Sequence, residues 1–164
     1  MWLPLVYHGA YGLALTLGWV ERDRRPPRLS SAQRWQRITG ATALVFIIWH
    51  TWQIRLRLAL GTMDGQDVYN ELAATLSSTA ALGIPVVALA YVVGMAATTS
   101  HLAVGAFCWA SEQGFTRTRA RARGVFWACA VSATLVFGWG LDSVVYFATG
   151  SNLLLSPAAS RSAN

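Results

Sequence analysis

The three histidines of the chain, His8, His50 and His101, each lie inside a long apolar stretch of sequence. Imidazole nitrogens are common metal ligands, and ionisable side chains inside apolar spans are functional candidates by default. The alternative is that each histidine only hydrogen-bonds a neighbouring helix. Because no histidine stands in a polar loop, metal binding is favoured over that alternative.

Haem suits these histidines better than zinc. A zinc site needs further nitrogen, sulfur or oxygen ligands, and no Asp, Glu or Cys stands beside the histidines at a useful spacing. Haem iron needs only two axial ligands, and its apolar ring fits inside a helix bundle. Gly12 follows His8 by four residues, and Gly105 follows His101 by four. Each glycine thus lies one helical turn on along the same face as its histidine and leaves room for a flat ring. Ordinary small-residue packing between helices is the alternative for both glycines.

The elements that must position these residues are four apolar segments, residues 2–20, 35–60, 79–112 and 124–148. A membrane-spanning helix needs about 20 apolar residues; the last three segments meet this length, and the first is shorter and contains Pro4. The composition agrees, because 54% of residues are hydrophobic and 12% charged, against about 25% charged in typical soluble domains. We therefore expect an all-α transmembrane helix bundle with four spans in one domain, residues 1–150, followed by a polar tail, residues 151–164.

The arginines are distributed unevenly, and this distribution predicts an orientation. They gather in residues 21–37 and 116–123, whereas residues 61–78 are acidic. Loops rich in Lys and Arg remain in the cytoplasm, so the acidic loop and both termini are expected outside. Nucleic-acid binding is the weaker interpretation of the arginines, because each cluster adjoins an apolar segment.

Counting residues along the helices places two of the histidines at the same depth. His8 lies 12 residues from Val20, and His101 lies 11 residues from Glu112, if these residues mark the cytoplasmic ends of their spans. At 1.5 Å per residue the distances are about 18 Å and about 16 Å, and His50 lies deeper, at about 22 Å. Two imidazoles at one depth on two helices can bind one metal from opposite sides.

Several motifs, taken in order and spacing, resemble a known family, the two-haem cytochrome b membrane anchor of bacterial succinate dehydrogenase and fumarate reductase. The similar stretches are LPLVYHGAYG (3–12), QRITGATALVFIIWHTWQIR (36–55), NELAATLSS (70–78) and HLAVG (101–105). They resemble, in turn, the second helix, the third helix, the connector and the fourth helix of that family. The last apolar segment would be its fifth helix, so the resemblance covers nearly the whole chain. Val104 departs from the pattern, because the family often has Asn there.

The resemblance implies a set of haem ligands. The family has five helices and four haem-ligating histidines, and His8 and His101 would ligate the haem nearer the iron–sulfur subunit. His50 would ligate the outer haem, but the family's first helix, which carries its partner, has no counterpart in this sequence. An internal Met assigned as the start, a helix supplied by another polypeptide, or a protein with a single haem would each explain this. The short first segment favours the start-site explanation.

The resemblance also implies a function. The chain would be a multi-pass subunit of the bacterial plasma membrane that transfers electrons and has no catalytic side chain of its own. Its partners would be flavoprotein and iron–sulfur subunits, lipid and a quinone, with menaquinone expected, and no nucleic acid; its cofactor would be one or two haems b. Arg34 and Arg37, near the cytoplasmic mouth of the second segment, suit haem propionates or would anchor the helix among lipid headgroups.

Two other functions remain open from the sequence. The chain could be the haem b anchor of another quinone-coupled oxidoreductase, such as a hydrogenase or a formate dehydrogenase. The Gln-Arg-x-Thr-Gly and His-Leu-x-x-Gly motifs argue against that choice. It could also be a haem-free membrane protein of four helices with a structural or transport role.

Overall fold

A computed structural model describes residues 2–20, 31–79 and 83–153, and every regular element within these ranges is helical. The expectation of an all-α bundle is therefore confirmed. The elements are α1 (Trp2–Leu17), α2 (Ser31–Thr51), the π-helical turn η1 (Trp52–Leu56), α3 (Arg57–Ala59), α4 (Val68–Ser77), α5 (Val86–Glu112) and α6 (Arg119–Thr149).

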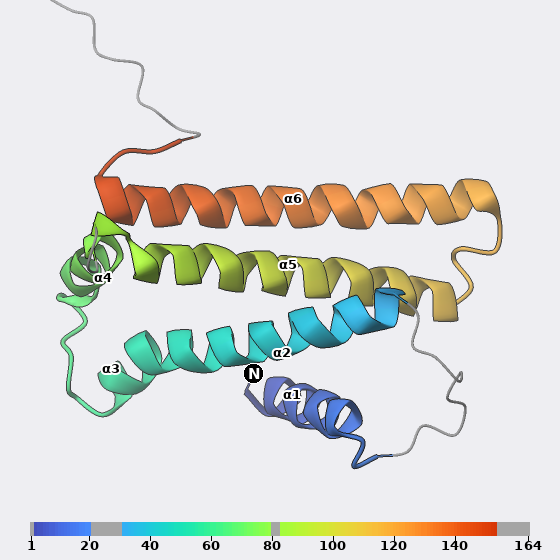
Figure 1. The fold of residues 1–164 in the computed structure, drawn as a ribbon, viewed down its shortest axis with the longest axis horizontal. Coiled ribbons are helices and arrows are strands. Elements are labelled where there is room, and N and C mark those ends of the chain that lie inside the picture. The colour runs from blue at the N-terminus through green and yellow to red at the C-terminus, as the bar shows by residue number, and fades with distance from the viewer. Residues whose placement is uncertain (1, 21–30, 80–82, 154–164) are drawn as a thin grey trace, which may run out of the picture.

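The long helices lie side by side (Figure 1). α5 packs against α6 on one side and against α2 on the other, and α1 packs on α2. α4 contacts α5 and α6 at the end of the bundle where α3 also lies. α2 therefore separates α1 from α5 and α6 over most of its length.

Two of the expected spans, α5 with 27 residues and α6 with 31, are long and apolar enough to cross a membrane; in the described part of the chain no other single helix meets both conditions. α1 has 16 residues, fewer than the roughly 20 that a span needs. α2, η1 and α3 follow one another without a break from residue 31 to residue 59.

Most large apolar side chains on α6 point away from the bundle, among them Trp139, which is 73% exposed. Such a surface favours contact with lipid over contact with water.

Two of the helix boundaries that differ from the segments read in the sequence have a clear local cause. α1 ends at Leu17 because Gly18 adopts a φ of 76°, and the amide of Trp19 donates to the carbonyl of Ala14 at 2.9 Å, which closes the helix end. α5 begins at Val86 rather than at residue 79. The residue before Pro85 is disfavoured in the helical region, and Gly83 has a φ of 71°.

Small buried residues bring α2 and α5 close together. They are Ala43 on α2 and Gly94 and Ala97 on α5. The ring of Phe46 lies over Gly94, where a Cβ atom would overlap it. This close approach sets which side chains of the two helices can meet.

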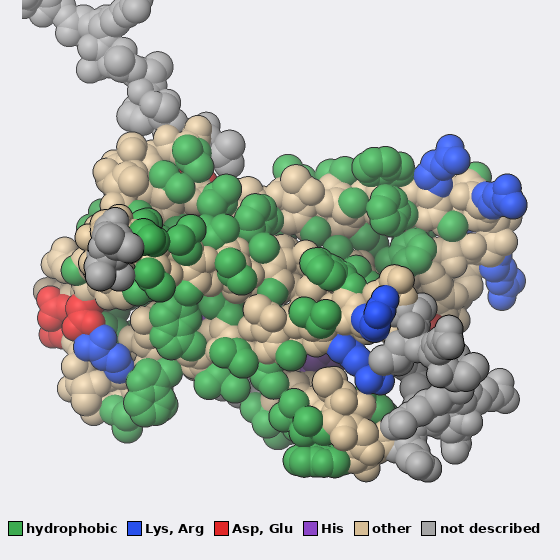
Figure 2. Space-filling view, in the orientation of Figure 1, with side chains coloured by type: hydrophobic (Ala, Val, Ile, Leu, Met, Phe, Trp, Pro, Cys, Tyr) green, Lys and Arg blue, Asp and Glu red, His purple; other side chains and the backbone are tan. Residues whose placement is uncertain are grey.

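Charged side chains gather at the two ends of the bundle, and apolar ones cover its length (Figure 2). One end carries the arginines at the starts of α2 and α6, namely Arg34, Arg37, Arg119, Arg121 and Arg123. The other end carries the acidic residues Asp64, Asp67 and Glu71, of which Glu71 belongs to α4. The separation agrees with the charge pattern from which orientation was predicted, and the sidedness itself stays a prediction.

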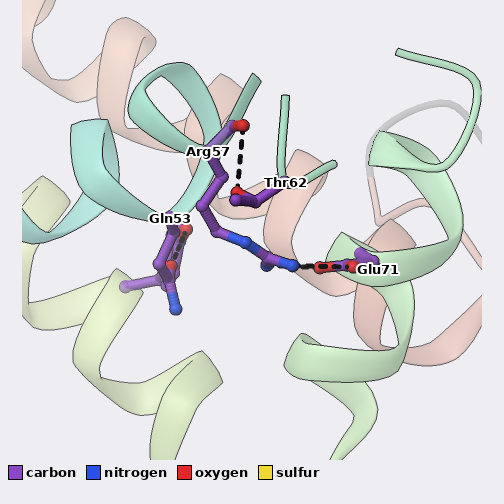
Figure 3. Close-up of polar contacts among 5 residues, drawn as sticks. Gln53, Arg57, Thr62 and Glu71 are labelled. Atoms are coloured by element: carbon purple, nitrogen blue, oxygen red, sulfur yellow. Dashed lines mark hydrogen bonds and ion pairs between the residues drawn. The ribbon is translucent and has the colours of Figure 1, made fainter. Parts of the chain in front are cut away.

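An ion pair joins two elements at the acidic end (Figure 3). The guanidinium of Arg57, on α3, binds both carboxylate oxygens of Glu71, on α4, with Nη2 and Oε1 2.9 Å apart. The hydroxyl of Thr62 donates to the main-chain carbonyl of Arg57 at 3.1 Å. The ion pair ties α4 to α3, and it gives an arginine on the predicted outer side an acidic partner.

Candidate functional site

The structure brings His8 and His101 together. His8 projects from α1 and His101 from α5, and their ring centroids lie 6.0 Å apart with the ring planes at 68°. The residue count along the sequence placed these two imidazoles at the same depth, and the folded chain also brings their rings close together. The bundle therefore brings two imidazoles, each of a type able to bind a metal, together from two different helices.

The separation of these rings fits one metal ion held between them. A metal–imidazole bond is about 2 Å long, and the ring centroid lies about 1 Å beyond the bonded nitrogen. Two imidazoles on opposite sides of one metal would thus have centroids about 6 Å apart. In the described part of the chain no group of three or more His, Cys, Asp or Glu side chains could hold a metal ion. Two imidazoles without further donors among the described residues suit haem better than zinc.

Gln36 holds His101 by two hydrogen bonds. The Nδ1 atom of His101 lies 3.1 Å from the main-chain carbonyl oxygen of Gln36. A carbonyl only accepts, so Nδ1 carries the proton and Nε2 keeps its lone pair. The side-chain amide of Gln36 donates in return to the carbonyl of His101 at 3.1 Å. A histidine that donates its other N–H to a carbonyl is the usual arrangement of a metal ligand.

Two glycines allow His101 and α1 to lie close to α2. A Cβ atom on Gly40 would lie 2.8 Å from Cε1 of His101, so the imidazole lies directly on the backbone of α2. A Cβ atom on Gly9 would lie 3.0 Å from the Leu44 side chain, so this glycine lets α1 approach α2. The roles of Gly9, Gly40 and Gln36 were not predicted from the sequence. The Gln-Arg-x-Thr-Gly motif, which begins at Gln36 and ends at Gly40, was the signal available.

The two glycines selected from the sequence, Gly12 and Gly105, have different surroundings from Gly9 and Gly40. At Gly12 a Cβ atom would meet nothing within 4 Å, and at Gly105 it would lie 3.1 Å from the Gln36 side-chain nitrogen. Gly105 therefore leaves space for the glutamine that holds His101. A contact of either glycine with a porphyrin stays a prediction.

Arg34 and Arg37 differ in their relation to this pair. Arg37 is half-buried and precedes Gly40 by three residues, so the two share one side of α2. Arg34 is exposed and precedes Gly40 by six residues, which turns it about 120° around the helix. Arg37 is therefore the better placed of the two to meet a carboxylate near His101. Propionate binding stays a prediction for both.

His50 lies apart from the other two histidines, in a polar trio with Tyr91 and Gln53. Its Nδ1 atom is 3.2 Å from the Tyr91 hydroxyl, and that hydroxyl donates to Oε1 of Gln53 at 2.8 Å. The ring of Phe46 stacks on the imidazole with centroids 5.8 Å apart. Iron ligation by any of the three histidines stays a prediction, and these distances are the geometric evidence that bears on it.

One curated relative shares the sequence over most of the chain. The succinate dehydrogenase cytochrome b558 subunit of Bacillus subtilis (strain 168) is 31% identical over an alignment of 122 residues that covers 72% of this chain. The chain is a homologue of the succinate dehydrogenase cytochrome b subunit. This confirms the resemblance drawn from the motifs and, with the apolar lengths of α5 and α6, identifies a membrane protein.

The homology does not extend over the whole relative. The chain spans about half of that subunit, because the matched residues make up 54% of its length. No family model matches the chain, and no solved structure matches it. The activity and partners of a whole cytochrome b subunit are therefore a matter of proposal for this chain.

Proposed function

We propose that the chain is the membrane anchor of a succinate dehydrogenase or fumarate reductase complex and carries electrons between its iron–sulfur subunit and the membrane quinone pool. The observation that carries the proposal is the His8–His101 pair, with ring centroids 6.0 Å apart and with Nδ1 of His101 bound to a main-chain carbonyl. The name of the relative, a cytochrome b558 of succinate dehydrogenase, supports haem b as the group between them. Haem b, when bound, supplies the one-electron exchange that the side chains of this region lack.

In this proposal the residues of the pair hold and orient the iron. His8 and His101 would hold the haem iron, and the Gln36 carbonyl would keep Nε2 of His101 unprotonated and free to bind by fixing the proton on Nδ1. Gly40 gives the imidazole the space to lie against α2. Arg37, on the same side of α2, pairs a propionate, because a guanidinium matches a carboxylate.

His50 would ligate a second haem from one side. The chain has three histidines in all, so no fourth imidazole of this sequence would pair with His50 at that haem. Flavoprotein and iron–sulfur subunits would be the protein partners, with the iron–sulfur subunit at the arginine-rich end of the bundle. Menaquinone is the quinone we expect.

Absorption and electron paramagnetic resonance (EPR) spectra of the purified protein test this proposal. We expect reduced b-type absorption bands, which fall sharply in His8→Ala and in His101→Ala because either change would remove one of the two imidazoles proposed to hold the iron. His50→Ala should leave the His8/His101 haem in place. A colourless preparation of intact protein would overturn the proposal in favour of a haem-free membrane protein. Loss of all haem in His50→Ala, with His8→Ala and His101→Ala unchanged, would overturn the pairing.

A further inference from the structure

The side chains around His50 form a chain of hydrogen bonds with a defined direction. The Tyr91 hydroxyl donates its only proton to Oε1 of Gln53 at 2.8 Å. The same hydroxyl oxygen lies 3.2 Å from Nδ1 of His50, so it can only accept a proton from that nitrogen. Nδ1 of His50 is therefore protonated, and Nε2 keeps its lone pair.

Tyr91 cannot leave this position easily. It is 5% exposed, and the rings of Phe46 and Trp49 pack on it with centroid distances of 5.4 Å and 5.1 Å. A buried tyrosine hydroxyl needs a hydrogen-bond partner. Its partners are Nδ1 of His50 and Oε1 of Gln53, so the hydroxyl is held between these two side chains.

Gln53 owes its place to the π-helical turn that follows His50. It lies in η1, which spans Trp52–Leu56, three residues after His50. Residues three apart share one side of a helix, and single π-helical turns recur at functional sites. From this turn the amide oxygen of Gln53 reaches the Tyr91 hydroxyl.

The direction of this chain decides what His50 can bind. If the Tyr91 hydroxyl donated to Nδ1 instead, the proton of the neutral imidazole would sit on Nε2 and block it as a ligand. Because Gln53 accepts the Tyr91 proton, the hydroxyl does not donate to Nδ1 of His50. At His101 the proton is held on Nδ1 by the main-chain carbonyl of Gln36, which no substitution removes. At His50 the same protonation depends on two side chains, Tyr91 and Gln53.

We propose that Tyr91 and Gln53 are positioning residues that hold His50 in the tautomer that presents Nε2 to haem iron. The inference rests on the proposed function, because it takes His50 as a haem ligand. The hydrogen bond from Nδ1 to Tyr91 raises the basicity of the imidazole. A more basic ligand favours ferric iron, so the bond lowers the midpoint potential of the haem that His50 ligates.

The test is Tyr91→Phe in the full complex, because this change removes one hydroxyl and keeps the ring. We expect the ratio of reduced to oxidised His50-ligated haem, at a fixed ambient potential, to rise about fivefold, or about 40 mV at 59 mV per tenfold change. The EPR g-values of that haem should shift, and those of the His8/His101 haem should not. That second haem is the internal control for folding. Tyr69→Phe is the matched control, because Tyr69 is exposed on α4.

Gln53 provides a second, independent variant. Gln53→Leu removes the acceptor and frees the Tyr91 hydroxyl to turn toward Nδ1, so haem occupancy at His50 should fall about tenfold. Gln53→Glu keeps an accepting oxygen at the same place and should retain the haem. A Leu variant that binds haem as well as the unchanged protein does would overturn the role of Gln53.

The outcomes separate this inference from the proposed function. If His50→Ala loses a haem signal but Tyr91→Phe leaves the potential and g-values of that haem unchanged, the inference is overturned and the proposed function stands. Equal shifts in both haems would also overturn it, because a loss of packing would act on the whole bundle. If His50→Ala loses no haem signal, His50 is no ligand, and both the second haem and this inference are refuted.

Discussion

At the scale of single residues, two of the candidate ligands are oriented through the same ring atom by different acceptors. Nδ1 of His101 binds a main-chain carbonyl, and Nδ1 of His50 faces a tyrosine hydroxyl. Each contact leaves Nε2 as the atom able to bind iron. The two positions therefore differ in the group that accepts the Nδ1 proton, which is a main-chain carbonyl at His101 and a tyrosine hydroxyl at His50.

Gly40→Ala should displace His101. The new methyl group would lie 2.8 Å from Cε1 of the imidazole, so the ring must move and its bond to the Gln36 carbonyl must lengthen. We expect haem occupancy at the His8/His101 pair to fall at least tenfold, read from the absorption of the purified protein. Gly138→Ala is the control, because a Cβ atom there meets nothing within 4 Å. Equal occupancy in the two variants would contradict the contact.

Arg37→Gln should lower the midpoint potential of the His8/His101 haem. Removing a positive charge near the iron disfavours the reduced form, which carries one positive charge fewer. We expect the reduced fraction at a fixed potential to fall about threefold, measured by redox titration. Arg34→Gln serves as the comparison, because Arg34 is turned away from the side of α2 that carries Gly40. A larger effect at Arg34 would reverse our assignment of the propionate partner.

At the scale of elements, α2 is the part that organises the site. It lies between α1 and α5, and its residues provide the carbonyl that orients His101, the glycine under that imidazole, and His50 itself. Small residues where α2 meets α5 keep the two backbones close. Any change that widens this interface should disturb both candidate positions together.

Gly94→Ala tests this role of the interface. A Cβ atom there would overlap the ring of Phe46, which also packs on His50 and Tyr91. We expect a loss of about 1 to 3 kcal/mol in the free energy of unfolding, followed by circular dichroism during thermal unfolding in detergent. Gly124→Ala, on an open side of α6, should be neutral or slightly stabilising. Similar unfolding temperatures for the two variants would argue against close packing at Gly94.

At the scale of the whole molecule, charge and apolar surface are separated along the bundle. Arginines occupy the end where α2 and α6 begin, and acidic residues the end where α4 lies. The apolar sides of α5 and α6 join the two ends. This is the pattern expected of a protein with its arginine-rich end in the cytoplasm.

Thiol labelling in intact cells tests the orientation. After both native cysteines, Cys108 and Cys129, are replaced by Ala, a single cysteine is introduced by Asp64→Cys or by Arg121→Cys. We expect a membrane-impermeant reagent to label the first variant in intact cells and the second only after the membrane is opened, because loops rich in arginine remain inside. Labelling in the opposite order would invert the predicted topology.

Much of the architecture was predictable from local patterns. The apolar segments predicted the long helices within a few residues, and counting along them set His8 level with His101. The start of α5 was misplaced because Pro85 outweighs the apolar run before it. The acidic partner of Arg57 was not predictable, because Glu71 approaches it only when α4 folds back against the end of α3.

The sequence by itself determined that the chain is helical, apolar and supplied with three imidazoles inside its helices, because hydropathy and residue spacing act locally along the chain. Only the tertiary structure decided which groups hold those imidazoles. The Gln36 carbonyl, the bare backbone of Gly40 and the Tyr91 hydroxyl all reach their histidines across helix interfaces. Such hydrogen bonds and clearances of a few ångströms depend on the rotation and register of packed helices, which no single helix encodes.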